Sequence, residues 1–173
     1  GCSKLKKAVF DDIDALIKTD FSSSSSNPLY VAKHLYFQDD LNKEIRSLHI
    51  SGYQGTINAC AFAGGENIDS IFISSYIDKI GSLAFNGCKN LKWVEFASVS
   101  ALCHITFHSQ ESNPLYYFHH IYVNGNNKEI TEIDVPEDIE DISSYAFINC
   151  EAITKVTISS SVRHIGKGAF QDD

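Results

Sequence analysis

The chain has 173 residues, of which 43% are hydrophobic and 21% are charged, and this balance is ordinary for one globular domain with a sizeable core. Its formal charge of -8 argues against nucleic acid or an anionic membrane surface as the main partner, because both favour a surplus of lysine and arginine. No run of about eighteen apolar residues occurs, so we expect no segment to insert into a membrane.

The amino-terminal segment lacks the pattern of a secretory signal peptide. The chain begins GCSKLKK without the apolar region of such a signal, and it contains no methionine, so we expect it to be a piece of a longer protein. Its five cysteines, at positions 2, 60, 88, 103 and 150, include no C-x-x-C pair. The spacing predicts neither a disulfide framework nor a zinc site, and we expect cysteines 2, 88 and 150 to be small buried residues.

Two long units of related sequence follow each other along the chain, at 1–86 and 87–173. GCSKLKKAVF at 1–10 matches GCKNLKWVEF at 87–96, and IDKIGSLAF at 77–85 matches VRHIGKGAF at 162–170. The offset is 86 at first and 85 later, which a single deletion explains. Self-similarity at a fixed period is typical of repeat proteins, so we interpret 1–173 as one repeat domain.

A shorter unit of about 23 residues recurs inside each long unit. Apolar residues alternate in a short segment around six marker positions, which in chain order are Ala8, Leu48, Ile71, Val94, Ile133 and Val156. The spacings between markers are 40, 23, 23, 39 and 23, so two of the units carry an insertion. Alternation predicts a strand with one buried face at each marker, followed by a turn, a second apolar pair and the dipeptide Ala-Phe.

Stacking of such coils gives an α/β repeat solenoid with a parallel sheet, built mostly of strands and short helical turns. Equivalent strands are then about 4.8 Å apart, and residues at equivalent positions pile up through the interior. We therefore expect the phenylalanines of the Ala-Phe dipeptides to stack as one aromatic column, formed by Phe62, Phe85, Phe147 and Phe170.

Each insertion contains the phrase Asn-Pro-Leu-Tyr, at 27–30 and again at 113–116. In the second insertion we expect a short helix within 99–105. The runs HHIYV and EITEIDV, joined by Asn-Gly, then predict a β-hairpin. We expect one such inserted hairpin in each of the two long coils. Recurrence at matched positions favours a structural role for the phrase, with its asparagine bonded to the local backbone.

Reactive side chains are numerous but show no catalytic or metal-binding spacing. Cys103 and His104 are adjacent and would point to different sides of a regular element, which is poor geometry for a nucleophile and its base. His34 and His120 occupy matched positions without a recurring third ligand, and the acidic run at 134–142 is interpreted as a solvated turn. We predict no catalytic site, metal site or cofactor. As the alternative to a structural role, the hairpin candidates for ligand contact are Tyr30, Tyr116 and His120.

The full pattern I-x-x-I-G-x-x-A-F-x-x-C-x-x-L-x-x-V-x-I resembles the BspA-like leucine-rich repeat family of bacterial and protist surface proteins. The resemblance covers the whole chain, although Gly65 stands where the motif has cysteine. It implies a secreted or cell-surface location and a non-enzymatic role in adhesion, with a protein or glycan on another cell or on the matrix as ligand. Flanking repeats of the same chain are the other partners that it implies.

Strand alternation also predicts a binding face. Residues one before and one after each marker point outward, and they include two large aromatic side chains, Phe72 and Trp93, on adjacent coils. Aromatic anchors dominate interface energetics, so we predict that these two rings form an apolar spot flanked by acids. The predicted ligand-binding residues of this face are His49, Phe72, Trp93, Glu95, Glu132, Asp134 and Lys155.

Two other functions remain alternatives to binding by the sheet face. The chain is then either a structural spacer in a long repeat array or, with the hairpins as wedges, an inhibitor of a secreted enzyme. Both ends of the sequence fall in the middle of a coil, so we expect them to expose core residues and to favour association or fraying.

Overall fold

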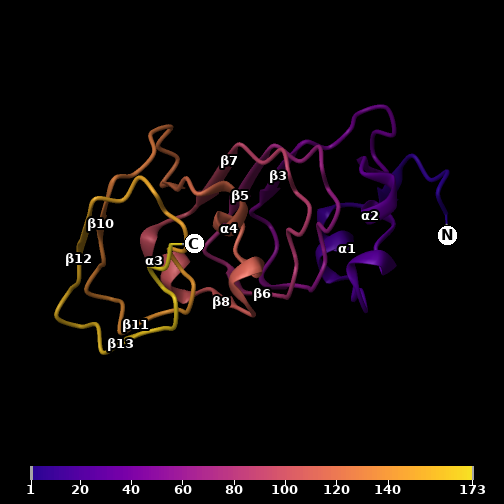
Figure 1. Cartoon of the computed structure of the whole chain (residues 1–173). Helices are drawn as coiled ribbons and strands as arrows, with labels where there is room; N and C mark the ends of the chain where they lie inside the picture. Colours follow the sequence, from indigo (N-terminus) through magenta and orange to yellow (C-terminus); the bar gives the residue numbers. More distant parts are fainter. Residues whose placement is uncertain (1, 173) are drawn as a thin grey trace.

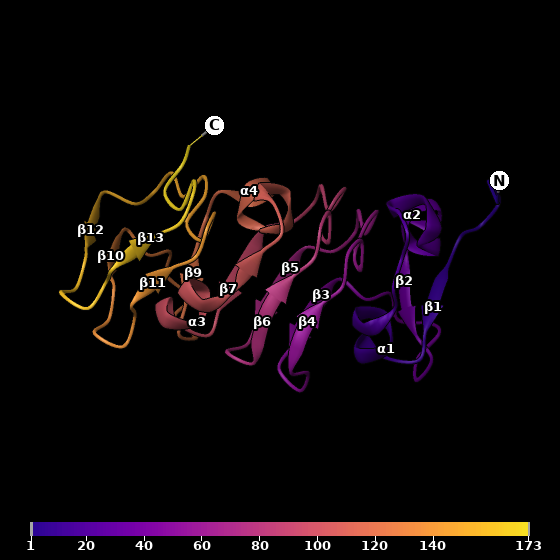
Figure 2. The ribbon, with the colours of Figure 1, turned by 90° about the horizontal axis from the view of Figure 1, so that it is seen from below.

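The computed structural model describes residues 2–172, and the chain runs from one end of the molecule to the other through short strands and helical turns (Figures 1 and 2). The strands are β1 Ala8–Phe10, β2 Leu35–Phe37, β3 Ser47–Ile50, β4 Gly55–Ile57, β5 Ser70–Ile73, β6 Ile77–Ile80, β7 Trp93–Phe96, β8 Thr106–Phe107, β9 Tyr122–Val123, β10 Glu132–Asp134, β11 Asp141–Ile142, β12 Lys155–Thr157 and β13 His164–Ile165. The helices are α1 Ile13–Lys18, α2 Pro28–Ala32, α3 Val99–His104 and α4 Leu115–Phe118, and the 3₁₀ turns are η1 Ser24–Ser26 and η2 Gln110–Ser112.

Two parallel sheets run along the central part of the molecule (Figure 2). The first has the strand order β3-β5-β7-β9 and the second has the order β4-β6-β8. Leu48 is paired with Ile71, and Ile71 is paired with Val94, which confirms the predicted parallel register at a spacing of 23 residues. The two-stranded sheets β1-β2, β10-β12 and β11-β13 lie toward the ends.

The core lies between the two sheets, where the inward residues of every coil meet. The marker residues Leu48, Ile71 and Val94 are each at most 1% exposed, and they alternate with half-buried or exposed residues. Steric crowding explains why the motif has glycine after the second strand. A Cβ on Gly81 would lie 2.5 Å from the backbone nitrogen of Ala59 in the preceding coil. Only glycine lets the second strand approach its neighbour this closely.

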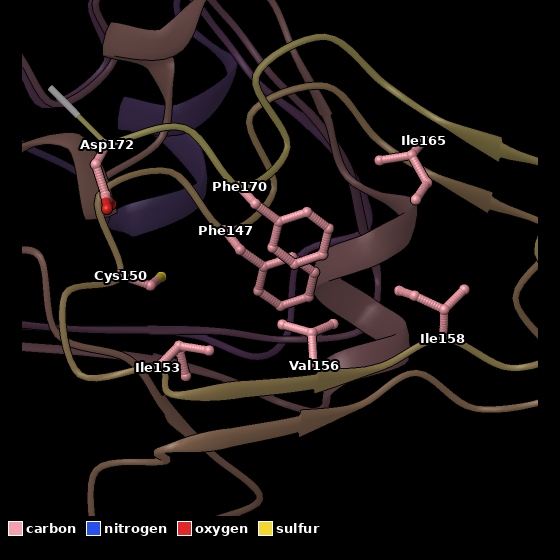
Figure 3. Close-up of a pocket in the computed structure, with 8 residues that line it drawn as sticks. All are labelled: Phe147, Cys150, Ile153, Val156, Ile158, Ile165, Phe170 and Asp172. Atoms are coloured by element: carbon pink, nitrogen blue, oxygen red, sulfur yellow. The ribbon is translucent and has the colours of Figure 1, made fainter.

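The phenylalanines of the Ala-Phe dipeptides form two stacked pairs instead of one column. The rings of Phe62 and Phe85 are 5.3 Å apart between centroids, and those of Phe147 and Phe170, shown in Figure 3, are 5.2 Å apart. The prediction of a continuous four-ring column is therefore wrong. The inserted segment between the two pairs contains α4 in place of an Ala-Phe dipeptide, and its Leu115 is fully buried.

The predicted β-hairpins are also wrong, although the Asn-Gly turn of the second one forms. Asn124 and Gly125 both have positive φ, of 63° and 65°, and the N–H of Asn126 donates to the carbonyl of Val123 at 3.2 Å. The two arms share one backbone hydrogen bond, from the N–H of Ile130 to the carbonyl of Ile121 at 3.1 Å, but β9 and β10 form no ladder with each other. β9 pairs in parallel with β7, and β10 pairs in parallel with β12; in the first unit β2 likewise pairs with β1. Each arm carries the alternation of a coil strand and pairs with a neighbouring coil.

The Asn-Pro-Leu-Tyr phrase starts a short helix and joins it to the next coil. The side-chain oxygen of Asn113 accepts the N–H of Leu115 at 3.0 Å, and its amide nitrogen donates to the carbonyls of Tyr145 and Ala146 at 2.8 and 3.1 Å. Asn27 makes the same three kinds of bond to residues 29, 60 and 61. Both asparagines are 0% exposed. The predicted local hydrogen bond is confirmed, and the link between coils explains why the phrase occurs twice.

Candidate ligand-binding face

The outward side of the sheet β3-β5-β7-β9 carries several of the predicted binding residues. His49 on β3 is the register partner of Phe72 on β5, and Phe72 is the register partner of Glu95 on β7. Glu95 is in turn paired with Tyr122 on β9, so four outward side chains follow one another across the sheet. All four are exposed or half-buried, whereas the residues that alternate with them are buried. These four side chains therefore lie on the outward side of the sheet, and the orientation predicted for His49, Phe72 and Glu95 is confirmed.

Four aromatic rings on this face form two stacked pairs. The ring centroids of His49 and Phe72 are 4.5 Å apart, with an angle of 13° between the planes. The centroids of Trp93 and Tyr122 are 3.7 Å apart, with an angle of 15°. Phe72 and Trp93 lie on adjacent strands but are offset by two positions in register, because Phe72 is opposite residue 95. The structure thus places the two predicted anchors in separate ring pairs on one face.

Glu95 holds the Trp93 ring and the Asn-Gly turn together. One carboxylate oxygen, Oε2, accepts the indole N–H of Trp93 at 3.3 Å, and the other, Oε1, accepts the backbone N–H of Gly125 at 2.6 Å. Two donors on one carboxylate restrict its motion and that of the indole. Glu95 is thus placed to orient the ring rather than to present an unpaired charge.

The other predicted charged residues belong to a different sheet. Glu132 and Asp134 lie on β10, and Lys155 lies opposite Glu132 on β12. The Lys155 ammonium is 3.0 Å from the Glu132 carboxylate, and this hydrogen bond, with the negative charges of Glu132 and Asp134, raises the pKa of Lys155. The predicted position of both acids beside Trp93 is wrong, because β9 occupies the place next to β7.

All three hairpin candidates have structural contacts, and two of them, Tyr30 and Tyr116, lie in helices rather than on this sheet. Tyr30 is in α2, where the Lys33 ammonium is 4.7 Å from its ring centroid, and Tyr116 is in α4, edge-to-face with Tyr117 at 5.1 Å. The Nδ1 atom of His120 is 2.7 Å from the carboxylate of Glu129. An equivalent pair in the first unit, His34 and Glu44, has the same distance. Each histidine pair closes the loop that leads from one coil strand to the next.

Tyr122 is the residue of this face that the sequence interpretation missed. The alternation of apolar residues in HHIYV is visible in the sequence. Interpreted as one arm of a hairpin, however, this segment has no predicted contact between Tyr122 and Trp93. A usable signal lies in the repeat, since Lys7 and Tyr36 occupy the places of Trp93 and Tyr122 at an offset of 86. The Lys7 ammonium is 4.4 Å from the centroid of the Tyr36 ring, so both units put the same two positions in contact.

The cysteine and histidine side chains considered for catalysis or metal binding do not form a site. Cys103 is buried, and burial raises the pKa of its thiol to about 12, while the Nδ1 atom of His104 is 2.8 Å from the carbonyl of Ser100. Within residues 2–172 no group of three or more His, Cys, Asp or Glu side chains is placed to hold a metal ion.

Cysteine reactivity gives a first testable prediction. Burial raises the pKa of Cys88 and of Cys150 to about 12, so both thiols stay protonated in the folded protein at mildly alkaline pH. Cys2 is exposed, against the expectation that it is buried, because no coil covers it in the described chain. We expect a thiol reagent to label Cys2 rapidly and the four buried cysteines only after denaturation. Rapid native labelling of Cys88, measured by mass spectrometry, would contradict the packing.

Comparison with known proteins identifies a repeat family. A family model described as BspA type leucine-rich repeat region matches the chain in six copies, over residues 33–125 and 55–173. A search of the curated proteins and a search of the solved structures gave no match. In the part of the chain that the structure describes, no helix is both long and apolar enough to cross a membrane.

Proposed function

Because the chain belongs to the BspA-type leucine-rich repeat family, we propose that it is a non-enzymatic binding module of a surface or secreted protein. Its ligand is a protein or glycan that docks on the outward face of the sheet β3-β5-β7-β9. The observation that carries this proposal is the pair of ring stacks on that face, His49 with Phe72 and Trp93 with Tyr122.

The position of Trp93 explains how a ligand would gain contact area. Tyr122 covers one face of the indole from the side of β9, so the other face is turned toward β5. The register partner of Trp93 on β5 is Ser70, which has a small, half-buried side chain. A flat or apolar group of the ligand can stack on the indole at this place.

The hydrogen bonds of Glu95 support the same role. A ring that is already held in place loses little conformational entropy when a ligand binds, so more of the contact energy appears as affinity. Glu95 bonds the Trp93 indole and, through Gly125, the turn that follows β9. The indole, its partner ring and the turn therefore form one preorganised unit.

The alternatives have less support in the structure. Inhibition of a secreted enzyme relied on protruding hairpins, and the strands expected to form them lie instead in parallel sheets. A structural spacer explains the repeats but gives no reason for Glu95 to hold an outward-facing tryptophan. The sheet face is therefore the preferred location of function.

The experiment is a binding screen followed by substitution on the face. We expect the chain to bind at least one member of a panel of extracellular proteins and glycans. We expect Trp93→Ala to weaken that binding tenfold or more, equivalent to about 1.4 kcal/mol. Glu132→Lys, on the separate sheet β10-β12, is expected to change affinity little. Full binding by the Trp93→Ala variant, with folding checked by circular dichroism, would rule out this face.

A further inference from the structure

The turn that follows β9 contains the dipeptide Asn124-Gly125, which is chemically labile. Asparagine is prone to deamidation, and a following glycine increases this tendency because no side chain shields the glycine nitrogen. Both residues are exposed, so water has access to the dipeptide and the Asn124 side chain can rotate toward the next peptide. The turn is therefore a candidate site of spontaneous modification.

The reaction starts with attack by a backbone nitrogen on a side chain. The nitrogen of Gly125 forms a bond to the carbonyl carbon Cγ of Asn124 and gives its proton to water, and the side-chain amide nitrogen leaves as ammonia. A water molecule then opens the resulting succinimide ring at one of its two carbonyls, which gives aspartate or isoaspartate. The first step requires a Gly125 nitrogen that can lose its proton and turn its lone pair toward Cγ.

Glu95 restrains this attacking nitrogen. Its Oε1 atom accepts the backbone N–H of Gly125 at 2.6 Å. A carboxylate is too weak a base to remove an amide proton, so the hydrogen bond keeps the proton on the nitrogen and fixes the plane of the peptide. Attack would also build up negative charge on the nitrogen and on the amide oxygen, and the charge of Glu95 opposes this. The carboxylate therefore slows the reaction.

Two backbone hydrogen bonds hold the same turn. The N–H of Asn124 donates to the carbonyl of Phe96 on β7 at 3.3 Å, and the N–H of Asn126 donates to the carbonyl of Val123 at 3.2 Å. Asn124 and Gly125 have φ of 63° and 65°, a left-handed conformation that asparagine and glycine tolerate. Ring closure requires rotation of the backbone at Asn124, which these bonds resist.

We propose that Asn124 is a deamidation site that Glu95 protects, and that modification of Asn124 releases the Trp93 ring. Either product adds a negative charge beside the Glu95 carboxylate, and isoaspartate also lengthens the backbone of the turn. Repulsion between the two carboxylates separates Glu95 from Gly125. The indole of Trp93, which donates to the other oxygen of Glu95 at 3.3 Å, then loses its fixed acceptor.

The rate of deamidation in variants of Glu95 tests the protection. Samples are incubated at mildly alkaline pH, and peptide mapping by mass spectrometry follows each asparagine. We expect Glu95→Ala to accelerate modification of Asn124 by about tenfold or more, which corresponds to a barrier lower by about 1.4 kcal/mol. Glu95→Gln keeps an acceptor oxygen but loses the charge, so we expect a smaller acceleration. Trp93→Phe removes the indole donor but leaves the bond to Gly125, and we expect it to retain the slow rate.

A second Asn-Gly dipeptide, at 86–87, provides an internal control in every sample. Asn86 is half-buried, and its carbonyl accepts the N–H of Gly64 at 2.7 Å. A Cβ on Gly87 would lie 3.4 Å from the backbone of Gly64, so this dipeptide is packed against the preceding coil. Its deamidation therefore reports general opening of the fold, and we expect it to be the same in wild type and in the Glu95 variants.

Two results would overturn the protection by Glu95. The first is a rate at Asn124 in Glu95→Ala that equals or falls below the wild-type rate, because the carboxylate would then be neutral or would assist the attack. The second is equal acceleration at Asn86 and Asn124 in both Glu95 variants, because modification would then follow unfolding.

Fluorescence tests the link to Trp93, which is the only tryptophan in the sequence. We expect Asn124→Asp to lower the anisotropy of the tryptophan emission and to shift it to longer wavelength, because a released indole moves more and meets more water. Asn127→Asp adds the same charge at an exposed position later in the segment, and we expect it to leave both quantities unchanged. Wild-type emission from Asn124→Asp, or an equal change in Asn127→Asp, would contradict release of the ring. These readouts require no ligand of the sheet face.

Discussion

Replacement of Phe85 by alanine is expected to lower the free energy of unfolding by about 3–5 kcal/mol, because it removes a large buried side chain and leaves a cavity. The Phe85 ring is 0% exposed and stacks on the ring of Phe62 at 5.3 Å. The surrounding backbone is held by bonds between coils, such as the N–H of Phe62 to the carbonyl of Ala84 at 2.8 Å, so it can collapse only partly into the cavity. Urea unfolding of both proteins measures the difference.

Phe170→Ala is the matched control for this substitution. Phe170 occupies the equivalent position in the second unit and stacks on Phe147 in the same way, at 5.2 Å, but its ring is 38% exposed. We expect its removal to cost about 1 kcal/mol. Equal costs for the two substitutions would show that the two rings do not differ in burial as described.

The second large effect is expected for Asn113→Ala. The substitution removes three hydrogen bonds at a site with no access to water, and it leaves the N–H of Leu115 and two carbonyls, of Tyr145 and Ala146, without this partner. A buried group left unpaired costs about 1–3 kcal/mol, so we expect a total loss of about 3–5 kcal/mol. The loss should appear as a lower urea midpoint.

Two further variants separate the hydrogen bonds from the general effect of substitution. Asn113→Asp keeps the acceptor for Leu115 but loses both donors, and we expect it to be at least as destabilising as Asn113→Ala. Asn126→Ala removes an exposed asparagine from the nearby turn, and we expect a change within about 0.5 kcal/mol. A small effect of Asn113→Ala would mean that the phrase is not the link between coils.

The strand positions and their register could be predicted because both depend on local alternation and on a constant spacing. Leu48, Ile71 and Val94 are 23 residues apart, and the same alternation surrounds each of them. Burial of one side of every strand leaves a single register that keeps these residues inside. The orientation of His49, Phe72 and Trp93 then follows without further information.

The coil that ends in β9 could not be predicted in the same way. Asn124-Gly125 specifies a tight turn through positive φ, but a turn does not determine which strands its arms pair with. Tyr122 lies 29 residues after Trp93, a spacing that matches no multiple of the repeat. Their stacking follows from the pairing of β9 with β7, which is a long-range property of the fold.

The role of Glu95 also depends on contacts that span the inserted coil. Alternation correctly places Glu95 on the outward side of β7, and for this reason it was predicted as a charged ligand contact. Its bond to the backbone of Gly125, 30 residues later, shows that its carboxylate serves the tryptophan and the turn. The acids Glu132 and Asp134 were misplaced for the same reason, since the intervening coil moves them to another sheet.

Titration of one ligand from the panel against variants of the sheet face tests the central claim most directly. Trp93→Ala removes the half-buried indole, and Ser70→Tyr puts a bulky side chain at its register partner while all four rings remain. Tyr76→Ala removes a side chain that is 60% exposed but lies in the turn before β6. We expect at least tenfold weaker binding for the first two variants and a change of less than about twofold for Tyr76→Ala. Unchanged binding by both Trp93→Ala and Ser70→Tyr would contradict ligand binding on this sheet face.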